Sequence, residues 1–180
     1  MPSIYLFGGS FNPPHRGHRQ VLEHLVQLPD AKAVWVIPVF SHPFSKDLEP
    51  FEHRKKMCEI LIQELPHCRV SLIEKIMGCS PSYTIDTLRA LRQECPEEKF
   101  TLVLGSDCRN ELPQWKEGNE IPKLASLYFI PRAGYEVSPF LDIASQTLRE
   151  RLTNGEDIHD FVLPEIEKYI KTYSLYQSNS

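Results

Sequence analysis

Near its start the chain reads Ile4-Tyr5-Leu6-Phe7-Gly8-Gly9-Ser10-Phe11-Asn12-Pro13-Pro14-His15-Arg16-Gly17-His18, an apolar run that passes directly into two glycines. The apolar run predicts a buried strand, and the paired glycines let a ligand approach the backbone closely. Gly17 opens a predicted helix, whose first turn has unpaired amides and a partial positive charge. The stretch therefore predicts a strand, a proline-stiffened loop and a helix N-terminus that together can hold an anion.

The two histidines of this stretch, His15 and His18, are three residues apart, so both side chains can face one target. Beside free amides they can bind a phosphate, and a polyanion raises the pKa of an imidazole and favours its charged form. The alternatives are one surface and one packing histidine, or a metal site, for which no third ligand stands at a telling distance. We favour phosphate binding, although the loop matches neither G-x-x-x-x-G-K-[ST] nor G-x-G-x-x-G.

The rest of the chain alternates short apolar runs with longer amphipathic ones. The predicted strands are residues 4–7, 33–37, 70–73, 100–104 and 127–130, and the predicted helices between them are residues 18–28, 51–65, 84–94 and 116–124. This order predicts an α/β fold with a doubly wound, mostly parallel, Rossmann-like sheet. Such sheets bind ligands at the carboxyl ends of their strands, where the strand order reverses.

Two further helices predict a C-terminal helical extension. One runs from about Gln146 to Thr153 and is stopped by Asn154-Gly155, and the other begins near Pro164. A Thr147-x-x-Glu150 capping box would start the first of them near Thr147. With 180 residues the chain is long enough for about one domain, so we expect a single domain over residues 1–176 and a frayed tail at 177–180.

Composition excludes several classes of function. The formal net charge is −4 and the isoelectric point is about 6.0, so the basic field of a generic nucleic-acid binder is missing. No stretch approaches the roughly 20 apolar residues that cross a bilayer, and there is no basic leader. Five scattered cysteines predict reduced, mostly buried thiols. We therefore expect a cytoplasmic protein that binds neither nucleic acid nor membrane; the sequence carries no signal for an oligomeric state.

The stretch G-G-S-F-N-P-P-H-R-G-H at residues 8–18 resembles the signature of the HxGH nucleotidyltransferases. It combines the H-x-G-H tetrad with the upstream Gly-Gly-x-Phe-x-Pro, and it follows the first predicted strand as in that family. The resemblance implies transfer of AMP or CMP from a nucleoside triphosphate to an acceptor that bears a phosphate.

Further stretches resemble the bacterial nicotinate-mononucleotide adenylyltransferases, and the similarity spans almost the whole chain. They are P-S-Y-T-I-D-T-L at 81–88, L-G-S-D at 104–107 with L-P-Q-W at 112–115, S-Q-T-L-R-E-R-L at 145–152, and the end of the chain from Leu163-Pro164 to Leu175-Tyr176. The resemblance implies transfer of AMP from ATP to nicotinate mononucleotide in NAD biosynthesis. It also implies Mg²⁺ bound through the nucleotide phosphates and no metal site built by the protein.

The same resemblance implies the roles of individual residues. It assigns catalysis to His15, His18 and Arg149, and ATP binding to these three and to Gly8, Gly9, Ser10, Phe11, Gly105, Asp107 and Ser145. It assigns acceptor binding to Lys46, Thr84 and Trp115. Each of the less obvious residues has a structural alternative: Asp107 as a helix cap, Thr84 as a cap, Trp115 in the core, and Arg149 on a solvated helix face.

Some positions depart from the family pattern. Ala144 and Gln146 stand where the family has a serine and a threonine, the segment from Arg132 to Ser145 is short, and a P-P-H-K loop is replaced by residues 41–46. These departures keep two alternatives open: a sister transferase that uses nicotinamide mononucleotide or phosphopantetheine, and a non-catalytic nucleotide-binding protein on the same fold.

Overall fold

The computed structural model describes residues 2–41, 47–132 and 134–177. The elements are, in chain order, β1 (Ser3–Gly9), α1 (Arg16–Leu25), β2 (Ala31–Pro38), α2 (Phe51–Leu61), β3 (Cys68–Val70), α3 (Ile73–Met77), α4 (Thr84–Glu94), β4 (Phe100–Gly105), α5 (Ile121–Leu124), β5 (Ser126–Ile130), α6 (Ser145–Thr153) and α7 (Pro164–Thr172). Short 3₁₀ turns at Ser106–Arg109, Leu112–Gln114 and Gly118–Glu120 join β4 to α5.

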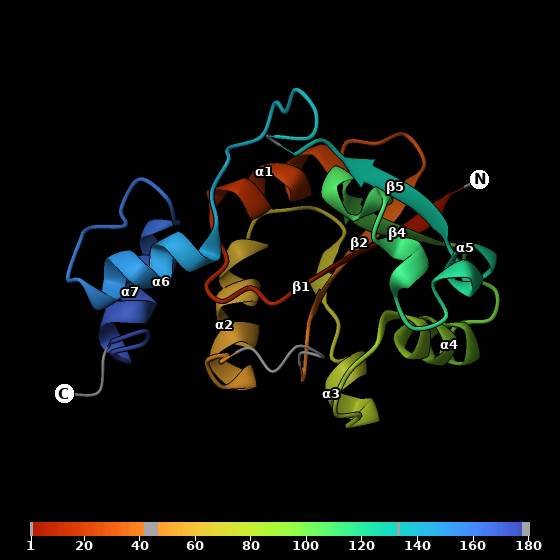
Figure 1. The fold of residues 1–180 in the computed structure, drawn as a ribbon, viewed down its shortest axis with the longest axis horizontal. Coiled ribbons are helices and arrows are strands. Elements are labelled where there is room, and N and C mark those ends of the chain that lie inside the picture. The colour runs from red at the N-terminus through yellow and green to blue at the C-terminus, as the bar shows by residue number, and fades with distance from the viewer. Residues whose placement is uncertain (1, 42–46, 133, 178–180) are drawn as a thin grey trace.

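The strands of the described chain form one sheet in the order β3-β2-β1-β4-β5, and every neighbouring pair is parallel. The chain builds β1, β2 and β3 outward in one direction and then crosses back to add β4 and β5 on the other side of β1 (Figure 1). The order therefore reverses between β1 and β4, which is where a doubly wound sheet binds its ligand. The predicted α/β fold is confirmed.

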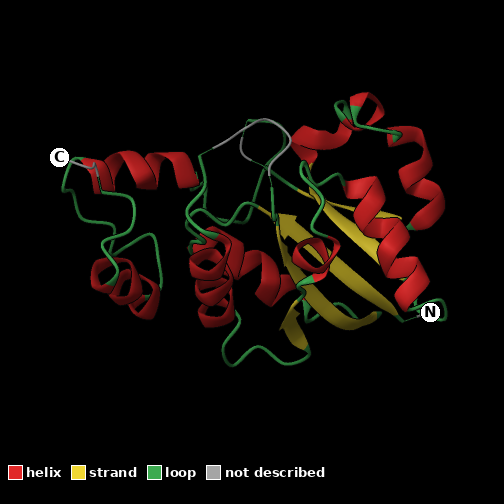
Figure 2. Cartoon of the chain, turned by 90° about the horizontal axis from the view of Figure 1, so that it is seen from below, coloured by secondary structure: helices red, strands yellow, loops and turns green. Residues whose placement is uncertain are grey.

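Alternating side chains divide the strands between two cores. In β1, Tyr5 faces the core that contains α1 and α2, whereas Ile4 and Leu6 face the core that contains α4 and α5. Helices therefore cover both faces of the sheet, as Figure 2 shows from below. Because both faces are buried, the strands read as continuous apolar runs rather than as alternating ones.

The C-terminal helices pack at the end of the molecule beyond α1 and α2, away from α4 and α5 (Figures 1 and 2). Leu148 of α6 and Ile166 and Ile170 of α7 are at most 2% exposed and belong to the core on the α1 and α2 face. The predicted helical extension is present, and it shares a hydrophobic core with the sheet.

Several predicted boundaries are wrong for local reasons. α1 begins at Arg16 and not at His18, because His15 caps it. The apolar run at 70–73 is not one strand: β3 ends at Val70, and Ile73 already belongs to the unpredicted helix α3. A short apolar run cannot distinguish a strand from a buried helical turn.

Three helix boundaries also differ. The chain leaves α2 at Leu61, and Glu64 adopts a left-handed φ of 65°. Of the predicted helix at 116–124, only Ile121–Leu124 form the single turn of α5, and Gly118–Glu120 before it form a 3₁₀ turn. α6 begins at Ser145 with Ala144 as its N-cap, so the capping box predicted at Thr147 is wrong.

Among the five cysteine thiols only Cys58 is fully buried, and Cys79 is exposed.

The turn after Trp115 gives a test of the fold. Gly118 is buried, and a Cβ placed there would lie 1.9 Å from the carbonyl oxygen of Leu112, a backbone atom that cannot rotate away. Gly118→Ala should therefore cost at least about 2 kcal/mol of the free energy of unfolding, as an overpacked site does. Urea unfolding measures the cost, with Asn119→Ala at the exposed neighbour as the control. Equal stability of the two variants would contradict the packing at this turn.

Candidate active site

A cavity of about 630 Å³ opens at the carboxyl ends of β1 and β4, where the strand order reverses. Every predicted nucleotide-binding residue lines it: Gly8, Gly9, Ser10, Phe11, His15, His18, Gly105, Asp107, Ser145 and Arg149. Of the predicted acceptor residues, Trp115 lines the cavity and Thr84 does not. Lys46 lies outside the described residues.

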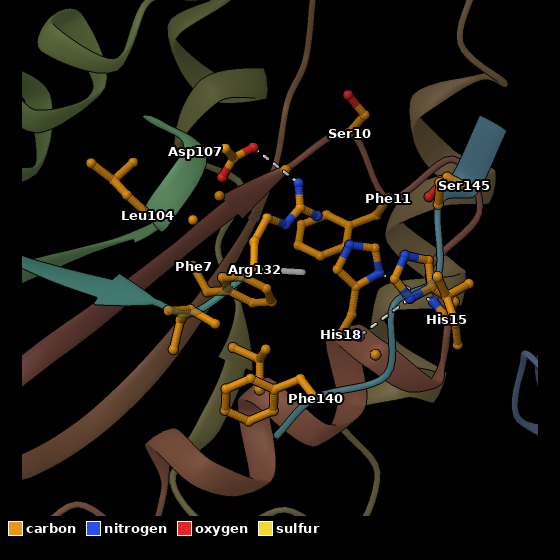
Figure 3. A pocket seen from close by; sticks show the side chains of 18 of the residues that line it. Phe7, Ser10, Phe11, His15, His18, Leu104, Asp107, Arg132, Phe140 and Ser145 are labelled. Atoms are coloured by element: carbon orange, nitrogen blue, oxygen red, sulfur yellow. Dashed lines mark hydrogen bonds and ion pairs between the residues drawn. The ribbon is translucent and has the colours of Figure 1, made fainter. Parts of the chain in front are cut away.

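The two imidazoles cap α1 reciprocally. His15 Nδ1 accepts a hydrogen bond from the His18 amide at 3.3 Å, and His18 Nδ1 accepts one from the His15 amide at 3.2 Å. The rings stack with their centroids 3.6 Å apart, and Figure 3 shows them side by side at the cavity. Because each Nδ1 is an acceptor, each neutral ring carries its proton on Nε2. The pair therefore presents two oriented N–H donors.

Both imidazoles are neutral in the free site. Burial, followed by the charge of Arg132, lowers the pKa of His15 to about 3. Burial, followed by the effects of His15 and Arg132, holds the pKa of His18 well below its ordinary range. The sequence predicted charged imidazoles for a site that holds a polyanion. In the free site the two rings are instead uncharged hydrogen-bond donors.

The loop between β1 and α1 is held by its carbonyl oxygens. Arg54 of α2 donates to the carbonyl of Ser10 at 2.9 Å. From α6, Arg149 donates to the carbonyl of Asn12 at 2.7 Å, and the Ser145 hydroxyl donates to that of Pro13 at 2.8 Å. Three acceptors that would repel an anion are thus already paired with donors. Arg149 and Ser145 line the cavity, and in the free site they hold the loop.

Aromatic packing fixes the floor of this loop. Phe11 has a left-handed φ of 47°, which is uncommon for a residue with a bulky side chain, and its ring is only 1% exposed. The ring contacts Phe7 of β1 edge-on at 5.6 Å between centroids and His18 at 5.0 Å. Burial of the Phe11 ring therefore compensates the strained backbone and supports the face of the His18 ring.

Asp107 lies in the turn that follows β4. Its Oδ1 is buried without a hydrogen-bond partner among the described residues, and its Oδ2 is 3.2 Å from Nη1 of Arg132. Gly105 makes this geometry possible, because a Cβ there would lie 2.1 Å from Oδ1. Asp107 is not the cap of the turn, which Gly105 occupies. A buried, unpaired carboxylate oxygen in a cavity is an acceptor for a ligand hydroxyl.

The start of α4 lies close to the Trp115 side of the cavity. Lys116 pairs with Asp86 at 2.7 Å, and its ammonium lies 4.6 Å from the centre of the Tyr83 ring. Thr84 is therefore on the helix turn beside Trp115 without lining the cavity, and Tyr83, not Thr84, is the N-cap. Trp115 is half-buried against the core on the α4 face.

A carboxylate that the sequence analysis missed joins this side of the site to β2. Glu74 of α3 accepts hydrogen bonds from the Phe40 amide at 2.9 Å and from the Thr87 hydroxyl at 3.1 Å. The amide of Val39, the residue before Phe40, donates to the carbonyl oxygen of Gly9 at 2.9 Å. Burial raises the pKa of the Glu74 carboxyl, and its hydrogen bonds oppose that shift. Glu74 thus links the turn after β2 to α4.

Other residues missed from the sequence are Arg54, Asn12 and Arg132. Arg54, Cys58 and Leu61 share a helical stripe, so a charge on the buried stripe of α2 was the available signal for Arg54. Arg132 follows β5 at the edge that also presents Gly9 and Gly105, and the strand-end rule could have found it. The Asn12 amide bonds the backbone of Asp47 and Glu49, which nothing in the sequence marks.

In residues 2–41, 47–132 and 134–177 no three histidine, cysteine or acidic side chains gather where they could hold a metal ion. Among the helices of those same ranges, none has the length and apolar character that a bilayer span requires.

Comparisons with known proteins agree with this geometry. The family model described as cytidylyltransferase-like matches residues 6–172. A probable nicotinate-nucleotide adenylyltransferase of Myxococcus xanthus is 36% identical, over 96% of this chain and 94% of its own length. The nicotinate-nucleotide adenylyltransferase of Bacillus subtilis is 28% identical over 99% of this chain and its full length. Plasmodium falciparum nicotinic acid mononucleotide adenylyltransferase, solved in complex with NaAD, superposes with a TM-score of 0.86 at 25% identity, covering 98% of both chains.

The neutral His15 ring predicts a pH dependence of stability. The pKa of this ring is lowered to about 3 in the folded protein and is about 6.5 in an unfolded chain, so between these values the unfolded state binds more protons. Stability is therefore complete above about pH 6.5 and falls on acidification, by up to roughly 1.4 kcal/mol per pH unit from this group.

His15→Asn keeps a capping acceptor and removes the titration, so its loss of stability from pH 6.5 to 4.5 should be shallower than that of the unmodified protein. Urea unfolding at pH 6.5, 5.5 and 4.5 measures both slopes. Parallel slopes would show that His15 is not held neutral.

Proposed function

This chain belongs to the cytidylyltransferase-like family and, within it, to the nicotinate-nucleotide adenylyltransferases, and from this membership we propose that it transfers AMP from ATP to nicotinate mononucleotide. The products are nicotinate adenine dinucleotide and pyrophosphate. The observation that carries the proposal is the stacked His15–His18 pair, whose oriented donors lie in the cavity at the point where the sheet order reverses.

The reaction needs positioning and charge stabilisation rather than a nucleophilic side chain. An oxygen of the acceptor phosphate attacks the α-phosphorus of ATP, a new P–O bond forms, and the bond to the β-phosphate oxygen breaks. The acceptor phosphate is already ionised near neutral pH, so no general base is required. The Nε2–H groups of His15 and His18 donate to oxygens of the transferring phosphoryl group, where charge rearranges in the transition state.

Other residues of the cavity divide the remaining work. Asp107 accepts hydrogen bonds from the ribose hydroxyls of the nucleotide with its carboxylate, one oxygen of which is buried and unpaired among the described residues. The first-turn amides of α6 and the unused guanidinium donors of Arg149 bind the departing pyrophosphate. Gln146, which stands where the family has a threonine, lines the cavity, and its side-chain amide donates to Glu150 at 3.0 Å. The threonine hydroxyl is therefore absent, but the backbone donors of α6 remain.

The charges of the cavity fit a divalent cation that arrives with the nucleotide. Asp47, Asp107 and Asp142 line the cavity with Arg132 and Arg149, and the imidazoles are neutral, so the described walls have no excess of positive charge. Mg²⁺ bound through phosphate oxygens and water would supply the missing charge neutralisation. The cytoplasmic location expected from the sequence belongs to the same proposal.

An acceptor comparison tests the proposal. With ATP and Mg²⁺, pyrophosphate release should be fastest with nicotinate mononucleotide, slower with nicotinamide mononucleotide, and absent with phosphopantetheine. Release with none of the three would leave a nucleotide-binding protein, and preference for another acceptor would reassign the substrate. His18→Ala should lower kcat by roughly 10²–10³ in a variant that still folds, as for loss of one oxyanion donor. Unchanged turnover of this variant would remove the imidazole pair from the mechanism.

Trp115 gives a separate test of the acceptor side. If its indole stacks on the pyridine ring, Trp115→Ala should weaken acceptor binding by about 1–3 kcal/mol, which is roughly a 5- to 150-fold rise in the acceptor KM. The KM for ATP should change little. Steady-state kinetics with each substrate varied in turn measures both constants, and an unchanged acceptor KM would exclude Trp115 from the binding site.

A further inference from the structure

The guanidinium of Arg132 is the one cation of the described cavity walls that is held by a side chain of the nucleotide site. Its backbone amide donates to the Ser106 hydroxyl at 3.0 Å, which anchors the residue beside the turn after β4. Its Nη1 then reaches Oδ2 of Asp107 at 3.2 Å. Figure 3 shows the guanidinium between the Asp107 carboxylate and the ring of His18.

The Asp107 carboxylate cannot serve Arg132 and a ribose fully at the same time. A ribose offers two vicinal hydroxyl donors, and a carboxylate meets both with its two oxygens. Oδ1 is already free and buried, but Oδ2 is taken by Arg132. A nucleotide that binds Asp107 through both hydroxyls therefore displaces the guanidinium from Oδ2.

Displacement costs little and leaves Arg132 close to the phosphates. The Arg132 side chain is 54% exposed, and ion pairs of such exposure contribute about 0–1 kcal/mol. Its charge already contributes to the lowered pKa of both His15 and His18, so the guanidinium lies near the rings that would hold the triphosphate. A guanidinium binds phosphate oxygens with paired, charge-assisted hydrogen bonds, which are stronger than an exposed ion pair.

We propose that Arg132 is a triphosphate ligand. In the empty site its guanidinium is paired with Asp107, and it moves to the phosphates when the ribose hydroxyls bind that carboxylate. The proposal rests on the proposed use of ATP, and it is independent of which acceptor is adenylylated. The exchange makes ribose recognition and phosphate binding cooperative, because the hydroxyl that takes Oδ2 of Asp107 releases the Arg132 guanidinium for the phosphates.

Calorimetric titration of Arg132→Ala with ATP and with adenosine tests the ligand role. ATP affinity should fall at least tenfold, whereas adenosine affinity should stay equal or rise severalfold, because nothing then competes with ribose at Asp107. Adenosine affinity that falls together with ATP affinity, or a loss of less than tenfold for ATP, would overturn the role. Thermal unfolding of the variant should match that of the unmodified protein.

Arg109→Ala is the matched control. Arg109 has a side chain 53% exposed, pairs with Glu136 at 3.6 Å, and does not line the cavity. Its removal should change neither affinity. An Arg109 variant that loses as much ATP affinity as the Arg132 variant would reduce the effect to general surface charge and overturn the proposal.

The exchange itself is tested with 2′,3′-dideoxy-ATP. Without ribose hydroxyls this nucleotide cannot displace Arg132 from Asp107, so Arg132→Ala should weaken its binding at least threefold less than it weakens ATP binding. Equal losses for the two nucleotides would overturn the exchange. Failure of ATP to bind the unmodified protein would overturn the proposed function as well, whereas ATP binding without adenylyl transfer would overturn the proposed function alone.

Discussion

The reciprocal hydrogen bonds between His15 and His18 are the interaction on which the site depends. The same two bonds begin α1, set the tautomer of each ring and stack the rings at the cavity. A helix N-terminus is usually capped by a small polar side chain that has no further use. Here the capping acceptors carry donors on their opposite side, so folding of the first helical turn and construction of the donor pair are one event.

The loop in front of this pair is organised by residues that are far away in the sequence. Arg54 of α2 and Ser145 and Arg149 of α6 bind three carbonyl oxygens of the loop, those of Ser10, Pro13 and Asn12. Arg54 is 1% exposed and meets backbone oxygens instead of a carboxylate, so no ion pair with another described residue neutralises its charge. α6, the first helix of the C-terminal extension, thus supports the loop as well as the core, and the site is complete only when both ends of the chain have folded.

The sequence predicted what depends on local pattern and missed what depends on packing. The β1 loop, the strand ends at Gly105 and Asp107, and the helix that carries Arg149 all follow from short motifs, and all reach the cavity. The roles of Arg54 and Glu74 could not be predicted, because they depend on which face of α2 or α3 points inward and on which loop that face contacts. The start of α6 was wrong because Ser145 uses its hydroxyl on Pro13, a partner 132 residues away, and not on its own helix.

A protein with a net charge of −4 that binds a polyanion cannot rely on its overall field. The described cavity walls do not supply one either, since neutral imidazoles and three aspartates stand beside two arginines. Binding therefore depends on directed donors: fixed N–H groups on the rings, helix amides, and guanidinium groups held by acceptors of the protein. A positive field attracts any anion, whereas directed donors bind tightly only an anion whose oxygens match their positions. Ion pairs such as Asp107–Arg132 fit this design, because they store a cation until the correct ligand replaces its partner.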